Sequence, residues 1–157
     1  MNAAIGEQDR AAAATLTFDL TRTSSRTTEE RRKGMPKASK GSASDHVELE
    51  GFEGHYAELG GTTVGWETYT ADADMTPLFA GLPDDRCQCE HWGFVFEGKV
   101  VFHTADGDEE FVGGDAYFVG PGHTPSIFAG TSLVEFSPTD RLNETMEIVT
   151  KNMEAAG

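Results

Sequence analysis

The stretch Gly81-Leu-Pro-Asp-Asp-Arg-Cys-Gln-Cys-Glu-His-Trp-Gly-Phe-Val-Phe-Glu-Gly98 combines a β-strand pattern with metal-binding side chains. We predict a strand over Arg86–Glu97, in which successive side chains would point to opposite faces of a sheet. Three metal-binding side chains would then share one face: Cys87, Cys89 and His91. The other face would carry three large aromatic side chains, Trp92, Phe94 and Phe96. We therefore expect the strand to be covered on both faces, on one of them by a second layer or a second subunit, which favours a homodimer.

Most of the chain after residue 45 has the same β-like composition. Short apolar and β-branched runs are separated by glycine-containing turns such as Gly60-Gly61, Glu97-Gly98 and Gly113-Gly114. Many short strands at regular spacing predict an all-β fold, an antiparallel barrel or sandwich. The predicted strands are His46–Glu50, His55–Leu59, Thr62–Thr70, Thr76–Phe79, Arg86–Glu97, Lys99–Thr104, Glu109–Val112, Ala116–Val119, Ser126–Ala129 and Ser132–Phe136.

The two ends of the chain differ from this body. The last segment, Arg141–Ala156, predicts one C-terminal helix, because its apolar residues are three or four positions apart: Leu142, Met146, Val149 and Met153. Residues 1–44 are rich in Ala, Ser, Thr, Arg and Lys and predict a disordered or loosely docked extension. Within it, Thr15–Leu20 has the alternation of an edge strand. The barrel with its helix is expected to span residues 45–157.

Charge and composition exclude several kinds of partner. Residues 46–157 contain four basic and 21 acidic residues, a formal net charge of −17. Such a surface repels nucleic acid and anionic membranes. No run of 18 or more apolar residues is present, and the N-terminus does not resemble a secretory signal. Cys87 and Cys89 are two residues apart, and side chains at that spacing in a strand are too far apart for an unstrained disulfide. We therefore expect free or metal-bound thiols and a cytoplasmic location.

Cys87, Cys89 and His91 indicate a divalent metal site. Thiolate and imidazole ligands favour zinc, and with other partners iron, nickel or copper. Two other interpretations stay open: the cysteines pack as small apolar side chains beside a hydrogen-bonded His91, or one thiol next to a protonated histidine is a nucleophile. The remaining histidines are expected at the surface, although His103 would reach the barrel interior if its strand turned it inward: His46, His55 and His103.

The spacing of these residues resembles the first sequence motif of the cupin superfamily, Gly-x5-His-x-His-x(3,4)-Glu-x6-Gly. Gly81-x5-Cys87-x-Cys89 matches the first half, with cysteine in place of both histidines. His91-x6-Gly98 matches the second half, with histidine in place of glutamate. One residue, Glu90, separates the halves. The chain is in this respect similar to small single-domain, cupin-2-like proteins.

A second stretch, Gly114-Asp-Ala-Tyr-Phe-Val-Gly-Pro-Gly-His-Thr-Pro125, resembles the second cupin motif, Gly-x5-Pro-x-Gly-x2-His-x3-Asn. Pro121 is displaced by one position, and Pro125 stands where the ligand histidine is expected. His123, two residues earlier, would have the same facing in an extended strand. The resemblance implies a jelly-roll barrel with a metal held by four residues that replace the usual histidines and glutamate: Cys87, Cys89, His91 and His123.

For function, the resemblance implies a small organic molecule bound in the barrel lumen beside the metal. An enzyme that uses the metal as a Lewis acid is one hypothesis, and no catalytic residue is assigned for it. A ligand-binding or sensing protein with a structural metal, or none, is the second, and an accessory protein whose dimer surface is functional is the third. Four ligands would close a tetrahedral zinc site, while three would leave a position for water. Of the two cysteines, Cys89 is expected to be the ligand and Cys87 to lie at the rim.

Overall fold

The computed structural model describes residues 34–156 of the chain. The predicted extension up to residue 33, with the possible edge strand Thr15–Leu20, lies outside the described residues. Residues 34–44 contain one short 3-10 turn, η1 (Lys40–Ser42), and the first strand begins at Asp45.

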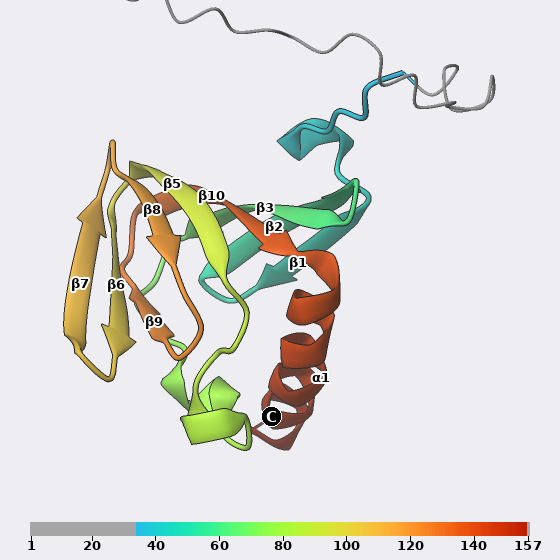
Figure 1. Ribbon diagram of the computed structural model, residues 1–157. Helices are drawn as coiled ribbons and strands as arrows, with labels where there is room; N and C mark the ends of the chain where they lie inside the picture. Colours follow the sequence, from blue (N-terminus) through green and yellow to red (C-terminus); the bar gives the residue numbers. More distant parts are fainter. Residues whose placement is uncertain (1–33, 157) are drawn as a thin grey trace, which may run out of the picture. The chain divides into compact units, whose positions relative to one another are not determined.

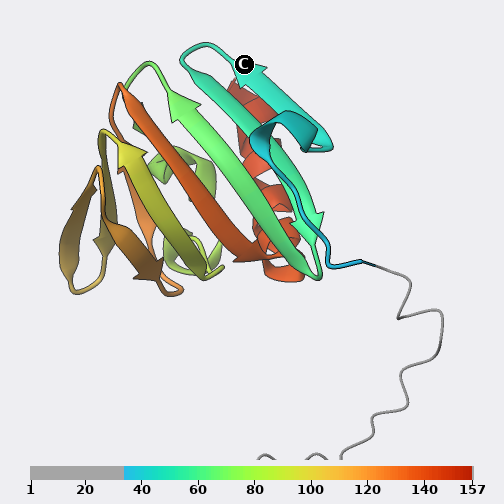
Figure 2. The same ribbon diagram turned by 90° about the horizontal axis from the view of Figure 1, so that it is seen from above.

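Two antiparallel sheets form the body of the described domain. The larger sheet has the strand order β1-β2-β3-β10-β5-β8, and the smaller one has the order β4-β9-β6-β7. Figure 2 shows the strands of the larger sheet side by side, with the smaller sheet next to its β8 end. The strands are β1 (Asp45–Leu49), β2 (Phe52–Leu59), β3 (Thr62–Tyr69), β4 (Ala73–Asp74), β5 (His91–Glu97), β6 (Lys99–Thr104), β7 (Gly107–Val112), β8 (Ala116–Val119), β9 (Thr124–Ile127) and β10 (Thr131–Pro138).

The last strand, β10, lies in the middle of the larger sheet between β3 and β5. This insertion brings the end of the chain next to the strand that carries His91. Side chains from both sheets fill the space between them and make the main core, which consists of Tyr69, Val95, Val100, Phe102, Tyr117, Val119 and Ile127. The predicted all-β antiparallel fold with one C-terminal helix is confirmed.

Two predicted strands differ most from the structure, while others differ by up to three residues at an end: β2 begins at Phe52 and not at His55, and β9 is Thr124–Ile127 and not Ser126–Ala129. Thr76–Phe79 is a 3-10 turn, η2, because Pro77 in its first turn has a fixed φ and no N–H to give to a sheet. A second turn, η3 (Pro83–Asp85), follows it. The strand predicted over Arg86–Glu97 begins only at His91.

The C-terminal helix, α1 (Thr139–Ala156), follows β10 directly and packs against η2 (Figure 1). Half of the predicted apolar stripe faces the barrel: Val149 is buried and Leu142 packs against the same cluster, whereas Met146 and Met153 are 42% and 37% exposed. Thr145 is buried beside Val149. The Asn152 side-chain amide donates hydrogen bonds of 2.8 Å to two carbonyls of the η2 region, Leu78 O and Ala80 O, and these polar contacts help to fix which face of the helix is covered. None of the helices within residues 34–156 is long and apolar enough to cross a bilayer.

Candidate metal centre

Three of the four predicted ligands come together at one end of the barrel. The potential ligand atoms of Cys87, His91 and His123 all lie within 4.8 Å of one another. Cys87 Sγ is 3.4 Å from His91 Nε2, and the His91 and His123 rings meet edge to face with centroids 5.1 Å apart. All three side chains are buried.

A short backbone bridge places Cys87 beside His123. The Cys87 N–H donates to His123 O at 2.8 Å, and the Gly122 N–H donates to Cys87 O at 2.7 Å. Cys87 precedes β5 and His123 precedes β9, so the bridge joins the approaches to both sheets. His91, the first residue of β5, completes the group from the larger sheet.

Cys89 lies outside this group, and the expected order of the two cysteines is reversed. Its thiol lies 3.4 Å from Glu90 O and packs with Phe79 and Val149 in an apolar cluster beneath α1. The prediction assumed that the alternation of a strand runs through residues 87–91. The chain instead bends at Cys89, and regular strand geometry begins at His91, so Cys89 does not share its facing. Both cysteines are free and buried.

Both imidazoles are held through Nδ1. His123 Nδ1 lies 2.7 Å from Gly120 O, and because a carbonyl only accepts, Nδ1 carries the proton and donates. His91 Nδ1 lies 2.7 Å from Ser137 Oγ and 3.3 Å from Glu135 Oε1. In His123 this leaves the Nε2 lone pair for a metal, and a proton on His91 Nδ1 shared with Glu135 would leave the Nε2 of His91 in the same state. Histidines that bind metals are oriented by such contacts to carbonyls and carboxylates.

Glu135 and Ser137, which contact His91, were not predicted from the sequence as part of the site. They come from β10, far along the chain from His91, and they reach it because β10 pairs with β5. One signal was present: Leu133 and Glu135 alternate along the predicted strand Ser132–Phe136, and Ser137 continues the alternation one residue beyond it, so a carboxylate and a hydroxyl share the face of a buried leucine.

Tyrosines surround two carboxylates on the inner face of the larger sheet. The Tyr117 hydroxyl donates to Glu135 at 2.6 Å. The hydroxyls of Tyr56 and Tyr69 each donate to Glu67 at 2.8 Å. Gly93 makes the first contact possible, because a Cβ at that position would lie 2.1 Å from the Tyr117 ring. These hydrogen bonds satisfy carboxylates that would otherwise be costly to bury.

Burial sets the protonation states of the group. It lowers the pKa of His91 and of His123 to about 4 and raises the pKa of Cys87 to about 11. At neutral pH the imidazoles are therefore neutral, the form that binds metals, and the thiol would lose its proton to a bound metal. Burial also raises the pKa of Glu135 to about 7. A nucleophilic thiol is disfavoured, because a histidine with so low a pKa is a weak base for so weak an acid.

The remaining histidines lie elsewhere. His103 on β6 points away from the core and bonds Asp108 Oδ1 and Ser126 Oγ, each at 2.8 Å. His46 is exposed on β1, and His55 is partly buried on β2.

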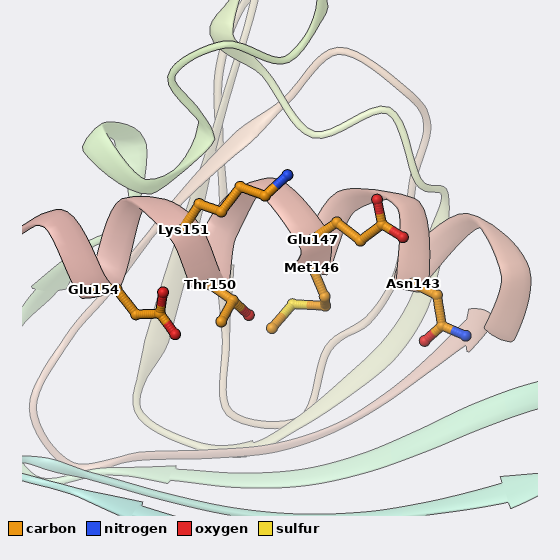
Figure 3. A pocket seen from close by; sticks show the side chains of 6 residues that line it. All are labelled: Asn143, Met146, Glu147, Thr150, Lys151 and Glu154. Carbon is orange, nitrogen blue, oxygen red and sulfur yellow. The ribbon is translucent and has the colours of Figure 1, made fainter.

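Neither of two hollows in the described domain is lined by Cys87, His91 or His123. A cavity of about 110 Å³ is lined by Phe102, Thr104, Glu109, Phe111, Phe118, Val119 and Gly120, and the Phe102 ring is 5.3 Å from that of His123. A larger hollow of about 690 Å³ runs along α1 (Figure 3) and contains none of the group's residues. Its lining consists of Asn143, Met146, Glu147, Thr150, Lys151 and Glu154.

No family model and no curated protein matches this chain. Among solved structures, similar folds occur in ectoine synthase from P. lautus (TM-score 0.48, 9% identity, 67% of this chain and 78% of that one). The polyketide cyclase RemF from Streptomyces resistomycificus has a TM-score of 0.47 and 12% identity, over 68% of this chain and 80% of that one. An RmlC-like cupin from Shewanella frigidimarina has a TM-score of 0.45 and 14% identity, over 64% and 88%. These likenesses concern the fold and transfer no function.

The structure thus defines an all-β fold of two antiparallel sheets with one C-terminal helix. Its inner face carries a cysteine and two histidines in a group that could hold a metal.

Proposed function

We propose that this protein is a small metal-binding cupin that holds a divalent metal through Cys87, His91 and His123. Zinc suits one thiolate and two imidazoles best, with iron, nickel or copper as alternatives. The observation that carries the proposal is the orientation of the histidines: hydrogen bonds at both Nδ1 atoms leave two Nε2 atoms beside the Cys87 thiol. In this proposal these residues replace the usual histidine and glutamate ligands of the cupin motifs.

Three protein ligands leave one position of a tetrahedral site open. A metal there would act as a Lewis acid or lower the pKa of a bound water. Glu135, with its pKa near 7, would hold or release a proton next to His91 Nδ1. The 110 Å³ cavity beside Phe102 has room for three or four waters at about 30 Å³ each, and none of the three ligands lines it. From the resemblance to the cupin motifs, we propose that a small organic molecule is bound or transformed at the metal.

The burial of the ligands supports a second candidate function. Cys87, His91 and His123 are only 2%, 6% and 1% exposed, and the Thr145 hydroxyl of α1 lies 4.0 Å from Cys87 Sγ. A closed site of this kind suits a structural metal in a non-enzymatic ligand-binding or sensing protein.

Cobalt substitution distinguishes the two functions. The proposal predicts that Co²⁺ binds at one equivalent per barrel centre and gives a thiolate-to-cobalt charge-transfer band, and that added azide shifts the visible bands by occupying the open position. A cobalt spectrum with the thiolate band but no response to azide would support the structural metal. A purified protein, without a histidine tag, that takes up less than about a tenth of an equivalent of zinc or cobalt at this centre would contradict metal binding.

We also propose that the protein forms a homodimer through the outer face of the larger sheet. Apart from Glu97, which pairs with Ser132 at the end of β5, the outward positions of β3, β10, β5 and β8 carry no charged side chain, although residues 46–157 carry a net charge of −17. Two acidic domains repel one another through their charged surfaces, so a mostly uncharged face favours their contact. Five aromatic side chains on this face are 37–58% exposed: Trp92, Phe94, Phe96, Phe118 and Phe136.

The area of the outer face that these five aromatic side chains form suits an interface between two copies of the chain. Five aromatic side chains of about 200 Å² each, about half exposed, offer roughly 500 Å² of apolar surface. A stable interface buries about 800 Å² per partner, so neighbours such as Trp66 and Val134 would supply the rest. An apolar patch of roughly 500 Å² is as large as the largest patch of a typical monomer, and such patches often mark interaction sites.

Sedimentation velocity tests the dimer. The 16.9 kDa chain is expected to sediment at twice its mass at micromolar concentration, and Phe118→Asp should return it to the monomer mass, because the charge would be buried in the interface. Val112→Asp is the matched control, since Val112 is 43% exposed on β7 of the smaller sheet. A monomeric wild-type protein, or equal dissociation by both variants, would overturn the assignment.

The cytoplasmic location is part of the same proposal. Both cysteines are free and buried, and free thiols persist in a reducing compartment. A fractionation that recovers the protein outside the cytoplasm would contradict it.

A further inference from the structure

Three side chains on the β1–β2 hairpin form a second cluster of metal-binding groups. His46 and His55 are direct partners across the two antiparallel strands, and Glu53 lies two residues before His55 on the same face. The potential ligand atoms of the three residues all lie within 4.8 Å of one another. All five histidines of the chain are in the described part, so these two are the only pair outside the barrel centre.

The distances suit a metal ion. Glu53 Oε1 is 3.5 Å from His46 Nε2 and 2.9 Å from His55 Nε2. Two ligand atoms about 2.1 Å from a tetrahedral zinc lie about 3.4 Å apart. The imidazole rings stack with centroids 4.3 Å apart and an 18° angle, so both Nε2 atoms face the same carboxylate oxygen. An ion could enter with small side-chain shifts.

The surroundings hold the carboxylate in place. Lys40 Nζ donates to Glu53 Oε2 at 3.0 Å, which leaves Oε1 for the imidazoles. Hydrogen bonds from His55 and Lys40 lower the pKa of Glu53 to about 2, so the carboxylate is ionised at neutral pH. The side chains of His46, Glu53 and His55 are 49%, 41% and 19% exposed. An ion from solution therefore has direct access.

We propose that His46, Glu53 and His55 form a surface site for a divalent transition-metal ion. Two imidazole nitrogens and one carboxylate oxygen are a donor set used for zinc, and such a site also takes copper and nickel. At least one coordination position would face solvent and be free for water or for a ligand from another molecule. The site is independent of the barrel centre. A surface ion pair of Glu53 with Lys40 and His55 is the competing explanation of the same contacts.

Zinc titration with a competing chelator tests the site in the full chain. The wild type should bind one equivalent more than His46→Ala or His55→Ala, each of which should weaken this site about tenfold or more. His103→Ala is the matched control, because His103 also bonds a carboxylate, Asp108, at 2.8 Å but has no second histidine within reach. These side chains are at the surface, so their removal should leave the fold intact.

Tryptophan fluorescence gives a local readout. Trp66 on β3 is the direct cross-strand partner of His55, and Trp92→Phe leaves it as the single tryptophan of the chain. Cu²⁺ bound at the site should quench Trp66, and His46→Ala should abolish that quenching while His103→Ala retains it. If the titrations of His46→Ala and His55→Ala superimpose on the wild type and Trp66 is not quenched, the cluster is a surface ion pair and the proposed metal site is wrong.

Discussion

Replacing His91 by alanine is expected to weaken zinc binding at the barrel centre by about 100-fold or more, since even the residues that support metal ligands contribute 10–100-fold. His123→Ala and Cys87→Ser should have effects of the same order. Each removes one of three donors, and the other two cannot hold a tetrahedral ion against water. In His91→Ala the Glu135 carboxylate also loses its imidazole partner at 3.3 Å. Chelator competition at constant pH measures all three affinities.

Cys89→Ser is the control for Cys87→Ser. Both substitutions place a hydroxyl in a buried site two residues apart, so their costs to folding should be similar. Only Cys87 belongs to the metal-binding group, and Cys89→Ser should leave zinc affinity within about threefold of the wild type. The thiolate-to-cobalt band should vanish in Cys87→Ser and persist in Cys89→Ser. If both variants lose the metal equally, Cys89 must rotate into the site on binding, and the three-ligand assignment is wrong.

Local sequence patterns predicted most of the fold because antiparallel strands have local signals. Lys99–Thr104 and Ala116–Val119 were predicted with their observed bounds, since glycine-containing turns and alternating residues define them. The strand predicted over Thr76–Phe79 is wrong, because Pro77 lacks the N–H that a strand requires. The apolar stripe of α1 was correct for Leu142 and Val149 and wrong for Met146 and Met153. The buried face also includes Thr145 and the hydrogen bonds of Asn152 to two carbonyls near η2, and hydrophobic spacing does not report such polar contacts.

The metal-binding group depends partly on contacts that local sequence patterns do not specify. Motif spacing predicted four ligands, and the structure brings three of them together: Cys87, His91 and His123. Cys89 was the preferred cysteine of the prediction, but it lies outside this group, because the strand begins at His91 and the bend at Cys89 interrupts the alternation. Glu135 and Ser137 depend on the insertion of β10 between β3 and β5, a pairing between distant segments that no local pattern specifies.

Gly98→Ala is expected to lower the free energy of unfolding by about 2–5 kcal/mol, a large part of the 5–15 kcal/mol that stabilises a typical domain. Gly98 joins β5 to β6 with a φ of +80°, a conformation that costs an alanine about 1–2 kcal/mol. A Cβ at this position would also lie 2.5 Å from Thr131 Cα, which is backbone and has little freedom to move. Such overpacking adds about 1–3 kcal/mol.

Thr131 makes this contact costly to relax. It is fully buried, and its hydroxyl bonds both backbone groups of Lys99, accepting from Lys99 N at 2.9 Å and donating to Lys99 O at 3.0 Å. Any shift of Thr131 away from a new Cβ would break this pair of bonds and disturb the β5–β6 turn.

Gly130→Ala separates the two contributions to the loss. Gly130 has nearly the same φ, +85°, but a Cβ there would meet no atom within 4 Å. It should lose only the conformational part, about 1–2 kcal/mol. Urea denaturation followed by circular dichroism, with equal slopes for all three proteins, measures the difference. Equal losses in Gly98→Ala and Gly130→Ala would mean that the β5–β6 turn yields to the methyl group, and that the close packing of Gly98 on Thr131 does not restrain the strand that begins at His91.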